Sequence, residues 1–198
     1  MYTIIDENST YIEDTVQIGN GSVIYPNVML VGNTIIGENT KIYVSSYIEN
    51  SVIGNNNTVY TSYIIDSEFG DNNLIGPYAY ILGGSVIENN NKIGSFVQIK
   101  NSAVKNGARI KHLSYVGDTI VEDNVNIGAG AQVANYDGEV KHRTLIKEGV
   151  FVGCNAVLVA PVTLNKNSVV AAGSTITDEV PEGNLAIARC RQTNKERE

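Results

Sequence analysis

The chain of 198 residues is poor in the residue types that build metal centres and disulfide frameworks. It contains only two cysteines, Cys154 and Cys190, and two histidines, His112 and His142. Neither cysteine belongs to a CxxC pair, and two cysteines do not make a disulfide framework, so we interpret both as free thiols. A zinc centre of three histidines would need a third ligand of another type. The sequence therefore predicts no metal.

Positive charge and long apolar runs are also scarce. The 14 lysines and arginines are outnumbered by 21 aspartates and glutamates, which gives a net charge of −7. Binding of nucleic acid relies on clustered cations that replace counterions, so this balance argues against a nucleic-acid partner. No stretch approaches the ~18 apolar residues of a membrane span, and the first ten residues lack the layout of a signal peptide. We expect a cytoplasmic protein with no membrane partner.

An aliphatic residue recurs every six positions along most of the chain. The first run extends from Ile12 to Ile48, and later runs extend from Ile75 to Ile99 and from Ile146 to Ile176. Small or β-branched residues lie four positions after the aliphatic residues of the first run: Val16, Ser22, Val28, Thr34, Thr40 and Ser46. Helices cannot produce a strict period of six, and a β-sandwich would alternate with period two. The pattern predicts a hexapeptide solenoid.

The repeat predicts an all-β, parallel β-helix. Each hexapeptide forms one short strand and a turn, and three of them wrap one triangular coil of about 18 residues whose inward residues form the core. About nine coils at ~4.8 Å each give a prism on the order of 45 Å long. We expect one domain over 1–198, one extruded loop at about 134–145 and a non-repeat tail from about 182. Spacing alone leaves open whether the loop is functional or decorative.

Counting hexapeptides in threes brings several polar side chains to one outer side. Leu82 and Lys100, 18 residues apart, are expected to stack there, and Gln98 and Tyr115 occupy the same side in successive coils. His112 lies in the corner that leads into this side, and the loop at Asn135 and Tyr136 leaves from it. A lone histidine at a turn would be read as a surface residue. Histidine with a pKa near ~6.5 suits a general base, and its neighbours here indicate a site.

Five segments, in order, carry a resemblance to a known family: KHLSYVGD, NVNIGAGAQVANYDG, FVGCNAVLVAPVT, VVAAGSTIT and LAIARCRQTNK. They resemble the acetyltransferase half of bifunctional N-acetylglucosamine-1-phosphate uridyltransferase/glucosamine-1-phosphate acetyltransferase, a hexapeptide acyltransferase of cell-wall precursor biosynthesis. The resemblance implies a left-handed helix, a homotrimer and acetyl-CoA as co-substrate bound between prisms. It covers about Ile75 to Lys195, with looser similarity back to Ile12.

The resemblance also implies roles for individual residues. His112 would be the general base that deprotonates the amine of an amino sugar or amino-sugar phosphate, which then attacks the thioester directly. The residues implied to bind this acceptor are Lys100, Tyr115, Asn126 and Lys141. The residues implied to contact acetyl-CoA are Ala129, Asn135, Tyr136, Cys154, Ala172 and Arg189. A covalent route through Cys154 is the less favoured alternative, because relatives often have serine there.

Two departures from the family pattern concern the acceptor. Leu82 stands where the family has an arginine that grips the sugar phosphate, and Gln98 stands where the family has a glutamate. Lys100 can replace the arginine's charge, although it cannot replace the forked geometry. A non-catalytic relative that binds acyl-CoA or sugar is therefore one alternative. A hexapeptide carbonic anhydrase is a weaker one, since only two histidines are available. The nucleotidyltransferase half and its Gly-rich loop are not expected in this chain.

Overall fold

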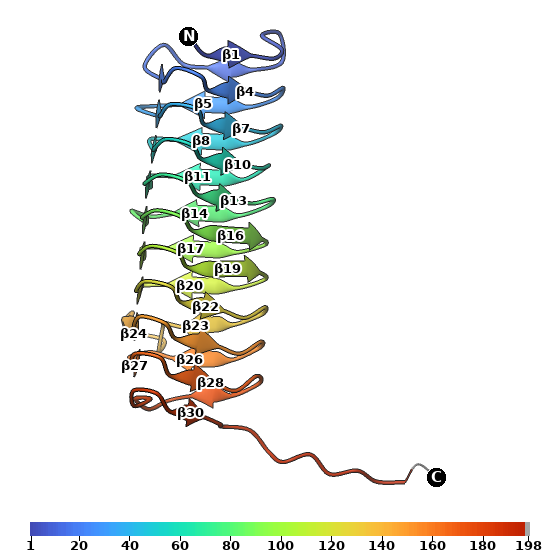
Figure 1. The fold of residues 1–198 in the computed structure, drawn as a ribbon, viewed down its shortest axis with the longest axis vertical. Coiled ribbons are helices and arrows are strands. Elements are labelled where there is room, and N and C mark those ends of the chain that lie inside the picture. Colours follow the sequence, from blue (N-terminus) through green and yellow to red (C-terminus); the bar gives the residue numbers. More distant parts are fainter. Residues whose placement is uncertain (197–198) are drawn as a thin grey trace.

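The computed structural model describes residues 1–196. The strands form a single column, and no helix is present in the described residues (Figure 1). The 30 strands belong to three parallel sheets of 11, 10 and 9 strands, and successive strands from β1 to β29 visit the three sheets in turn. Three strands per coil give ten coils, stacked from the N-terminal to the C-terminal end of the column. The predicted parallel β-helix of hexapeptide repeats is confirmed.

The three sheets form the three sides of the prism. The first sheet contains β1 (Thr3–Ile4), β4 (Val23–Ile24), β7 (Lys41–Ile42), β10 (Thr58–Val59), β13 (Leu74–Ile75), β16 (Lys92–Ser95), β19 (Arg109–His112), β22 (Asn126–Ile127), β25 (Phe151–Val152), β28 (Val169–Val170) and β30 (Leu185–Ala186). The second sheet contains β2 (Tyr11–Ile12), β5 (Met29–Val31), β8 (Tyr47–Glu49), β11 (Tyr63–Ile65), β14 (Tyr80–Leu82), β17 (Gln98–Lys100), β20 (Tyr115–Gly117), β23 (Gln132–Ala134), β26 (Val157–Val159) and β29 (Thr175–Ile176). The third sheet contains β3 (Gln17–Ile18), β6 (Ile35–Ile36), β9 (Val52–Ile53), β12 (Glu68–Phe69), β15 (Val86–Ile87), β18 (Ala103–Val104), β21 (Thr119–Val121), β24 (Thr144–Ile146) and β27 (Val162–Leu164).

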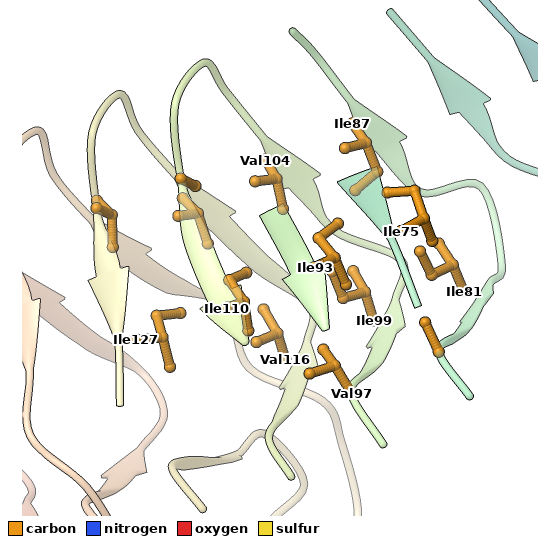
Figure 2. Packing of buried hydrophobic residues seen from close by; sticks show 14 of the residues in the cluster. Ile75, Ile81, Ile87, Ile93, Val97, Ile99, Val104, Ile110, Val116 and Ile127 are labelled. Atoms are coloured by element: carbon orange, nitrogen blue, oxygen red, sulfur yellow. The ribbon is translucent and has the colours of Figure 1, made fainter. Parts of the chain in front are cut away.

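The periodic aliphatic residues fill the interior. Ile81, Ile99 and Val116 are partners in adjacent strands of the second sheet, and each is almost fully buried. Figure 2 shows such residues pointing inward from successive coils. Residues on either side of each inward position point outward, because side chains alternate along a strand. The six-residue phase therefore assigns both the core and the outer surface.

Buried polar residues four positions after the inward residues form hydrogen bonds between adjacent coils. The Ser22 hydroxyl accepts the Thr40 amide at 2.9 Å, and the Thr40 hydroxyl accepts the Asn57 amide at 3.1 Å. The side-chain carbonyl of Asn57 in turn accepts the amide of Asn73 at 2.8 Å. These groups are satisfied inside the prism, which explains why small or hydrogen-bonding residues recur at this position.

Left-handed backbone marks the corners. Asparagine holds most of the non-glycine positions with positive φ, as expected for a residue that tolerates this region. We call the turn from each first-sheet strand to the next second-sheet strand the first corner. Here Tyr78, Phe96 and Leu113 adopt positive φ in three successive coils, although each is large and each side chain is more than half exposed.

The interruptions of the repeat lie where expected. The chain leaves the solenoid between Ala134, the end of β23, and Thr144, the start of β24, within the predicted loop. The segment from about 182, expected to be a non-repeat tail, still contributes β30, which pairs with β28. The chain then departs from the column (Figure 1).

Candidate active site

The predicted stacking on the second sheet is confirmed by strand register. Leu82 pairs with Lys100, which pairs with Gly117, and Gln98 pairs with Tyr115. The stem of Lys100 also lies over Gly83, since a Cβ added at that glycine would be 3.4 Å from Lys100 Cγ. Lys100 and Tyr115 therefore share one outer face, in adjacent coils, as the sequence predicted.

Gly117 makes room for the phenol of Tyr115. A Cβ at Gly117 would lie 2.3 Å from Tyr115 Oη and 2.8 Å from Asn135 Nδ2. The tyrosine ring thus folds back over the bare backbone two residues further along β20, with its hydroxyl beside the base of the loop. The glycine of the YVGD segment is a requirement of this packing, because any side chain there would displace the ring.

A buried carboxylate anchors the loop to the solenoid. Asp118, in the turn after β20, is 7% exposed and accepts hydrogen bonds from the side-chain amides of Asn101 in the coil before and Asn135 in the coil after. Its backbone carbonyl also accepts the Thr144 amide at 3.2 Å, where the chain re-enters the sheet. Asn135, predicted to contact acetyl-CoA, is itself 6% exposed and uses its amide in this clamp.

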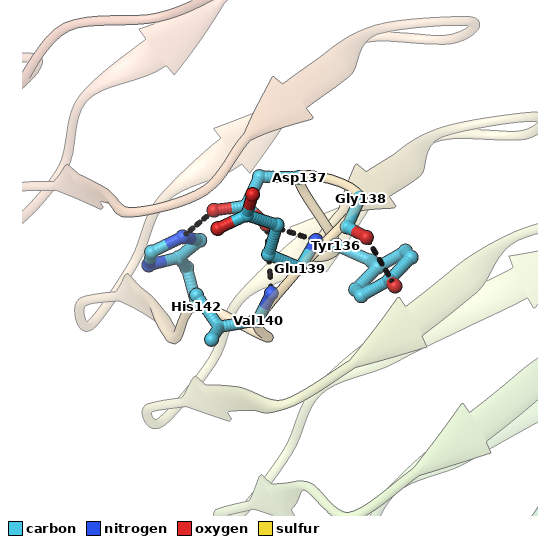
Figure 3. Close-up of polar contacts among 6 residues, drawn as sticks. All are labelled: Tyr136, Asp137, Gly138, Glu139, Val140 and His142. Atoms are coloured by element: carbon cyan, nitrogen blue, oxygen red, sulfur yellow. Dashed lines mark hydrogen bonds and ion pairs between the residues drawn. The ribbon is translucent and has the colours of Figure 1, made fainter.

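A second carboxylate organises the loop internally (Figure 3). Asp137 Oδ1 accepts the amides of Glu139 and Val140, both at 2.8 Å, and its Oδ2 lies 2.6 Å from His142 Nε2. Hydrogen bonding to the His142 ring, followed by the two amides, holds the pKa of Asp137 far below its usual range. The two arms of this loop meet at an isolated antiparallel bridge between Tyr136 and Lys141. Tyr136, predicted to contact acetyl-CoA, and Lys141, predicted to bind the acceptor, are therefore neighbours.

His112, the predicted base, begins a column along the first corner that continues with residues predicted to contact acetyl-CoA. It ends β19, and the following coils place Ala129, Cys154 and Ala172 at the equivalent position. Backbone hydrogen bonds join them in order: Gly130 N to His112 O at 3.2 Å, Asn155 N to Ala129 O at 2.8 Å, and Gly173 N to Cys154 O at 2.8 Å. Arg189 extends the column, with its Cδ 3.9 Å from a Cβ built at Gly173.

The size of the side chains at the first corner changes after the coil of His112. Up to and including that coil, the positive-φ residues of the corner are Tyr78, Phe96 and Leu113, which we call the apolar ridge. In the following coils the corner consists of residues no larger than asparagine: Gly128, Ala129, Gly130, Gly153, Cys154, Asn155, Ala171, Ala172 and Gly173. We call this second stretch the bare trough. From His112 to Arg189 it spans four coil steps, about 19 Å at ~4.8 Å per step, which suits a long extended ligand.

The predicted acceptor residues are not all on one side of the prism. Lys100 and Tyr115 belong to the second sheet, whereas Asn126 lies on the first sheet, between Arg109 and Phe151. His112 stands at the corner between them, exposed, and it lines a hollow of about 300 Å³ on the first-sheet side. Asn135, Tyr136 and Lys141 leave from the opposite end of the second-sheet strands. Within one prism the predicted acceptor residues on the sheets therefore form two groups: Lys100 and Tyr115 on the second sheet, and Asn126 on the first.

Sequence reasoning missed Gly117, Asp118 and Asp137. A signal existed for each: the first two complete the YVGD segment, and Asp137-Gly138 is a typical turn pair with an acceptor for nearby amides. No group of three or more His, Cys, Asp or Glu side chains that could hold a metal ion is found within residues 1–196. In the same range there is no helix long and apolar enough to cross a membrane.

These observations define a hexapeptide β-helix with a histidine at the head of a bare trough. The family described as bacterial transferase hexapeptide (six repeats) matches residues 15–49, 66–101 and 143–178, more than half of the chain. The protein therefore belongs to the bacterial transferase hexapeptide family.

Relatives agree with the resemblance carried by the motifs. The chain is 48% identical over 193 residues to a protein of Clostridium kluyveri named Bifunctional protein GlmU, and 51% identical over 194 residues to one of Clostridioides difficile with the same name. Each alignment covers 98% of this chain and 42% of the relative, so the chain spans less than half of the relatives' length.

Solved structures confirm the fold. The UDP-N-acetylglucosamine acyltransferase of Arabidopsis gives a TM-score of 0.76 at 17% identity, covering 92% of this chain and 71% of that one. LpxA of Acinetobacter baumannii gives a TM-score of 0.67 at 18% identity, covering 94% of this chain and 71% of that one. At these identities the likeness concerns the backbone alone.

Proposed function

We propose that the protein is an acetyl-CoA-dependent N-acetyltransferase that acts on an amino sugar or amino-sugar phosphate. The observation that carries this proposal is the column of His112, Ala129, Cys154 and Ala172 along one corner. Acetyl-CoA would lie along the bare trough with its thioester at His112 and its phosphates toward Arg189. The relatives named Bifunctional protein GlmU support an activity of this class.

The reaction needs a neutral amine, a base within hydrogen-bond reach and a donor for the developing oxyanion. The exposed imidazole of His112 would take a proton from the acceptor ammonium or from the attacking amine, and the amine would form the amide as the C–S bond breaks. Lys100, Tyr115, Asn126 and Lys141 would orient the sugar. Cys154, exposed within the trough, would serve as a contact, with a covalent acyl-enzyme as the less favoured route.

We further propose that the active unit is a homotrimer. The acceptor residues divide between two sheets of one prism, so a single sugar could reach both groups only where the first corner of one copy faces the second sheet of another. The apolar ridge supports such packing, since Tyr78, Phe96 and Leu113 expose 57%, 60% and 59% of their surfaces. Tyr78 and Phe96 stack with ring centroids 5.3 Å apart, which makes the ridge continuous.

Thiol release from acetyl-CoA in the presence of glucosamine 1-phosphate, glucosamine and other amino sugars tests the proposal. We expect amine-dependent turnover by the wild type and a loss of at least about 100-fold in kcat for His112→Ala, the usual scale of general base catalysis. Sedimentation and thermal unfolding should show an intact trimer. Undiminished turnover by the alanine variant would remove the base assignment. Acetyl-CoA binding without transfer to any amine would favour the non-catalytic alternative.

A further inference from the structure

The hollow beside His112 is cationic and has no assigned role. Its volume is about 300 Å³, and its lining includes Lys92, Lys111 and Ser95 as well as the imidazole. The register of β16 and β19 places Ser95 opposite His112 and Lys92 opposite Arg109. Leu74, Gly76, Ile93 and Gly94 complete the lining.

The positive charge of this hollow is uncompensated. Neither Lys92 nor Lys111 takes part in an ion pair within residues 1–196. The outward positions of the first sheet around them hold no acid: the neighbouring residues are Thr58, Tyr60, Leu74, Gly76, Gly94, Arg109, Asn126 and Gly128. In a chain with a net charge of −7, a face with three cations and a histidine and no carboxylate is a local reversal of sign.

We propose that this hollow is the subsite for an anionic group of the acceptor, a phosphate monoester, with Lys111 and Lys92 as its specificity-determining residues. The inference rests on the proposed acetyltransferase function and deepens it. On the second sheet Leu82 stands where the family resemblance implies an arginine, whereas Lys111 places a positive charge next to His112. Two ammonium groups, the Ser95 hydroxyl and the imidazole match the charge and hydrogen-bonding capacity of a phosphate.

The phosphate could come from the acceptor or from CoA, which carries phosphates of its own. The hollow lies on the N-terminal side of His112, over β13, β16 and β19, whereas the bare trough leads in the opposite direction. A thioester at His112 therefore places the far end of CoA away from the two lysines. For this reason we assign the hollow to the acceptor.

Lys41 offers a matched control. It precedes an inward isoleucine of the first sheet, as Lys92 does, and it is exposed, but it lies three strands away in that sheet, outside the hollow. The test measures steady-state kinetics of the full chain with glucosamine 1-phosphate and with glucosamine. For Lys111→Ala and Lys92→Ala we expect KM for glucosamine 1-phosphate to rise about tenfold, the scale of one charge-assisted contact. KM for glucosamine and for acetyl-CoA should stay unchanged, and Lys41→Ala should match the wild type.

Three results would overturn the inference. They are an unchanged KM for glucosamine 1-phosphate, an equal rise with glucosamine, and a rise in KM for acetyl-CoA, which would assign the hollow to the donor. Calorimetric titration of glucosamine 1-phosphate into the same variants separates this inference from the proposed function. If no amine is acetylated but binding weakens only in the Lys92 and Lys111 variants, the subsite stands and the transferase proposal fails. If acetylation proceeds and all variants bind glucosamine 1-phosphate equally, the transferase proposal stands and the subsite fails.

Discussion

The first corner carries opposite surfaces in its N-terminal and C-terminal coils on the same backbone. In the N-terminal coils the residues after the inward position are Tyr25, Tyr43 and Tyr60, whose rings stack with centroids 4.3 and 4.5 Å apart. In the C-terminal coils the equivalent residues are Gly128, Gly153 and Ala171. The same backbone thus carries stacked aromatic rings in its N-terminal coils and small side chains in its C-terminal coils.

Filling the bare trough should have the largest effect. Ala172 is exposed within it, and a tryptophan there would occupy the path that we assign to acetyl-CoA. We expect Ala172→Trp to raise KM for acetyl-CoA at least tenfold, a cost of about 1.4 kcal/mol or more. Val44→Trp introduces the same bulk at the same corner position among the tyrosine-rich coils and should leave this KM unchanged. An equal rise of KM for acetyl-CoA in the two variants would show that the bare trough has no special role in binding acetyl-CoA.

Displacing Tyr115 should have the next largest effect. A methyl group at Gly117 would collide with the Tyr115 hydroxyl and with the Asn135 amide. We expect Gly117→Ala to raise KM for the amino sugar by up to about tenfold. Tyr115→Phe serves as the comparison, because it removes the hydroxyl without moving the ring. If Gly117→Ala leaves the acceptor KM at the wild-type value, Tyr115 has no part in binding the sugar.

Loosening the loop should have a smaller effect. Asp137→Asn removes the ionised acceptor that receives two amides and the His142 ring. We expect faster hydrogen exchange over residues 137–142 and a rise of about threefold in KM for acetyl-CoA, less than 1 kcal/mol. An unaltered exchange rate in this segment would show that Asp137 does not order the loop.

The depressed pKa of Asp137 sets the pH range of this contribution. A carboxyl group whose folded pKa lies below its unfolded value, near ~3.9, stabilises the folded loop above that value and loses the effect as pH falls toward the folded pKa. The protection factors of the wild-type loop, which divide out the pH dependence of intrinsic amide exchange, should therefore show no Asp137-dependent change between about pH 5 and 8 and should fall below about pH 4. A loss of protection confined to neutral pH would contradict this sign.

The tyrosine stack should affect stability alone. Removing the central ring with Tyr43→Ala deletes both stacked contacts, each worth about 0.5–1.5 kcal/mol beyond buried area. We expect a lower midpoint of thermal unfolding with kcat and both KM values unchanged. A change of kcat or of either KM in this variant would show that the N-terminal coils contribute to activity, contrary to the distinction drawn between the two regions.

The sequence was most informative where the six-residue period holds. The period predicted that Lys100 stacks on Leu82 and Tyr115 on Gln98, because a constant period converts position in the chain into position on the prism. It also located the loop. The clamp of Asn101, Asp118 and Asn135 was not predicted, since it depends on which way side chains turn at a corner.

Sequence reasoning also overlooked the distribution of the site over the prism. Counting from Ile110 through Val116 and Val121 to Ile127 places Asn126 on the sheet of Arg109 and not on that of Lys100. The family resemblance grouped Asn126 and Lys100 in one role, so this count was not made. The hollow beside His112 is lined by residues in and next to three adjacent strands, β13, β16 and β19, so it becomes visible only when these strands lie next to one another.

Hydrogen–deuterium exchange with and without acetyl-CoA maps the donor on the wild-type protein and shows whether it lies along the bare trough. We expect slower exchange on binding in residues 128–130, 153–155 and 171–173, and unchanged exchange in residues 25–61. Protection confined to the tyrosine-rich coils, or absent from the glycine and alanine turns below His112, would contradict this expectation.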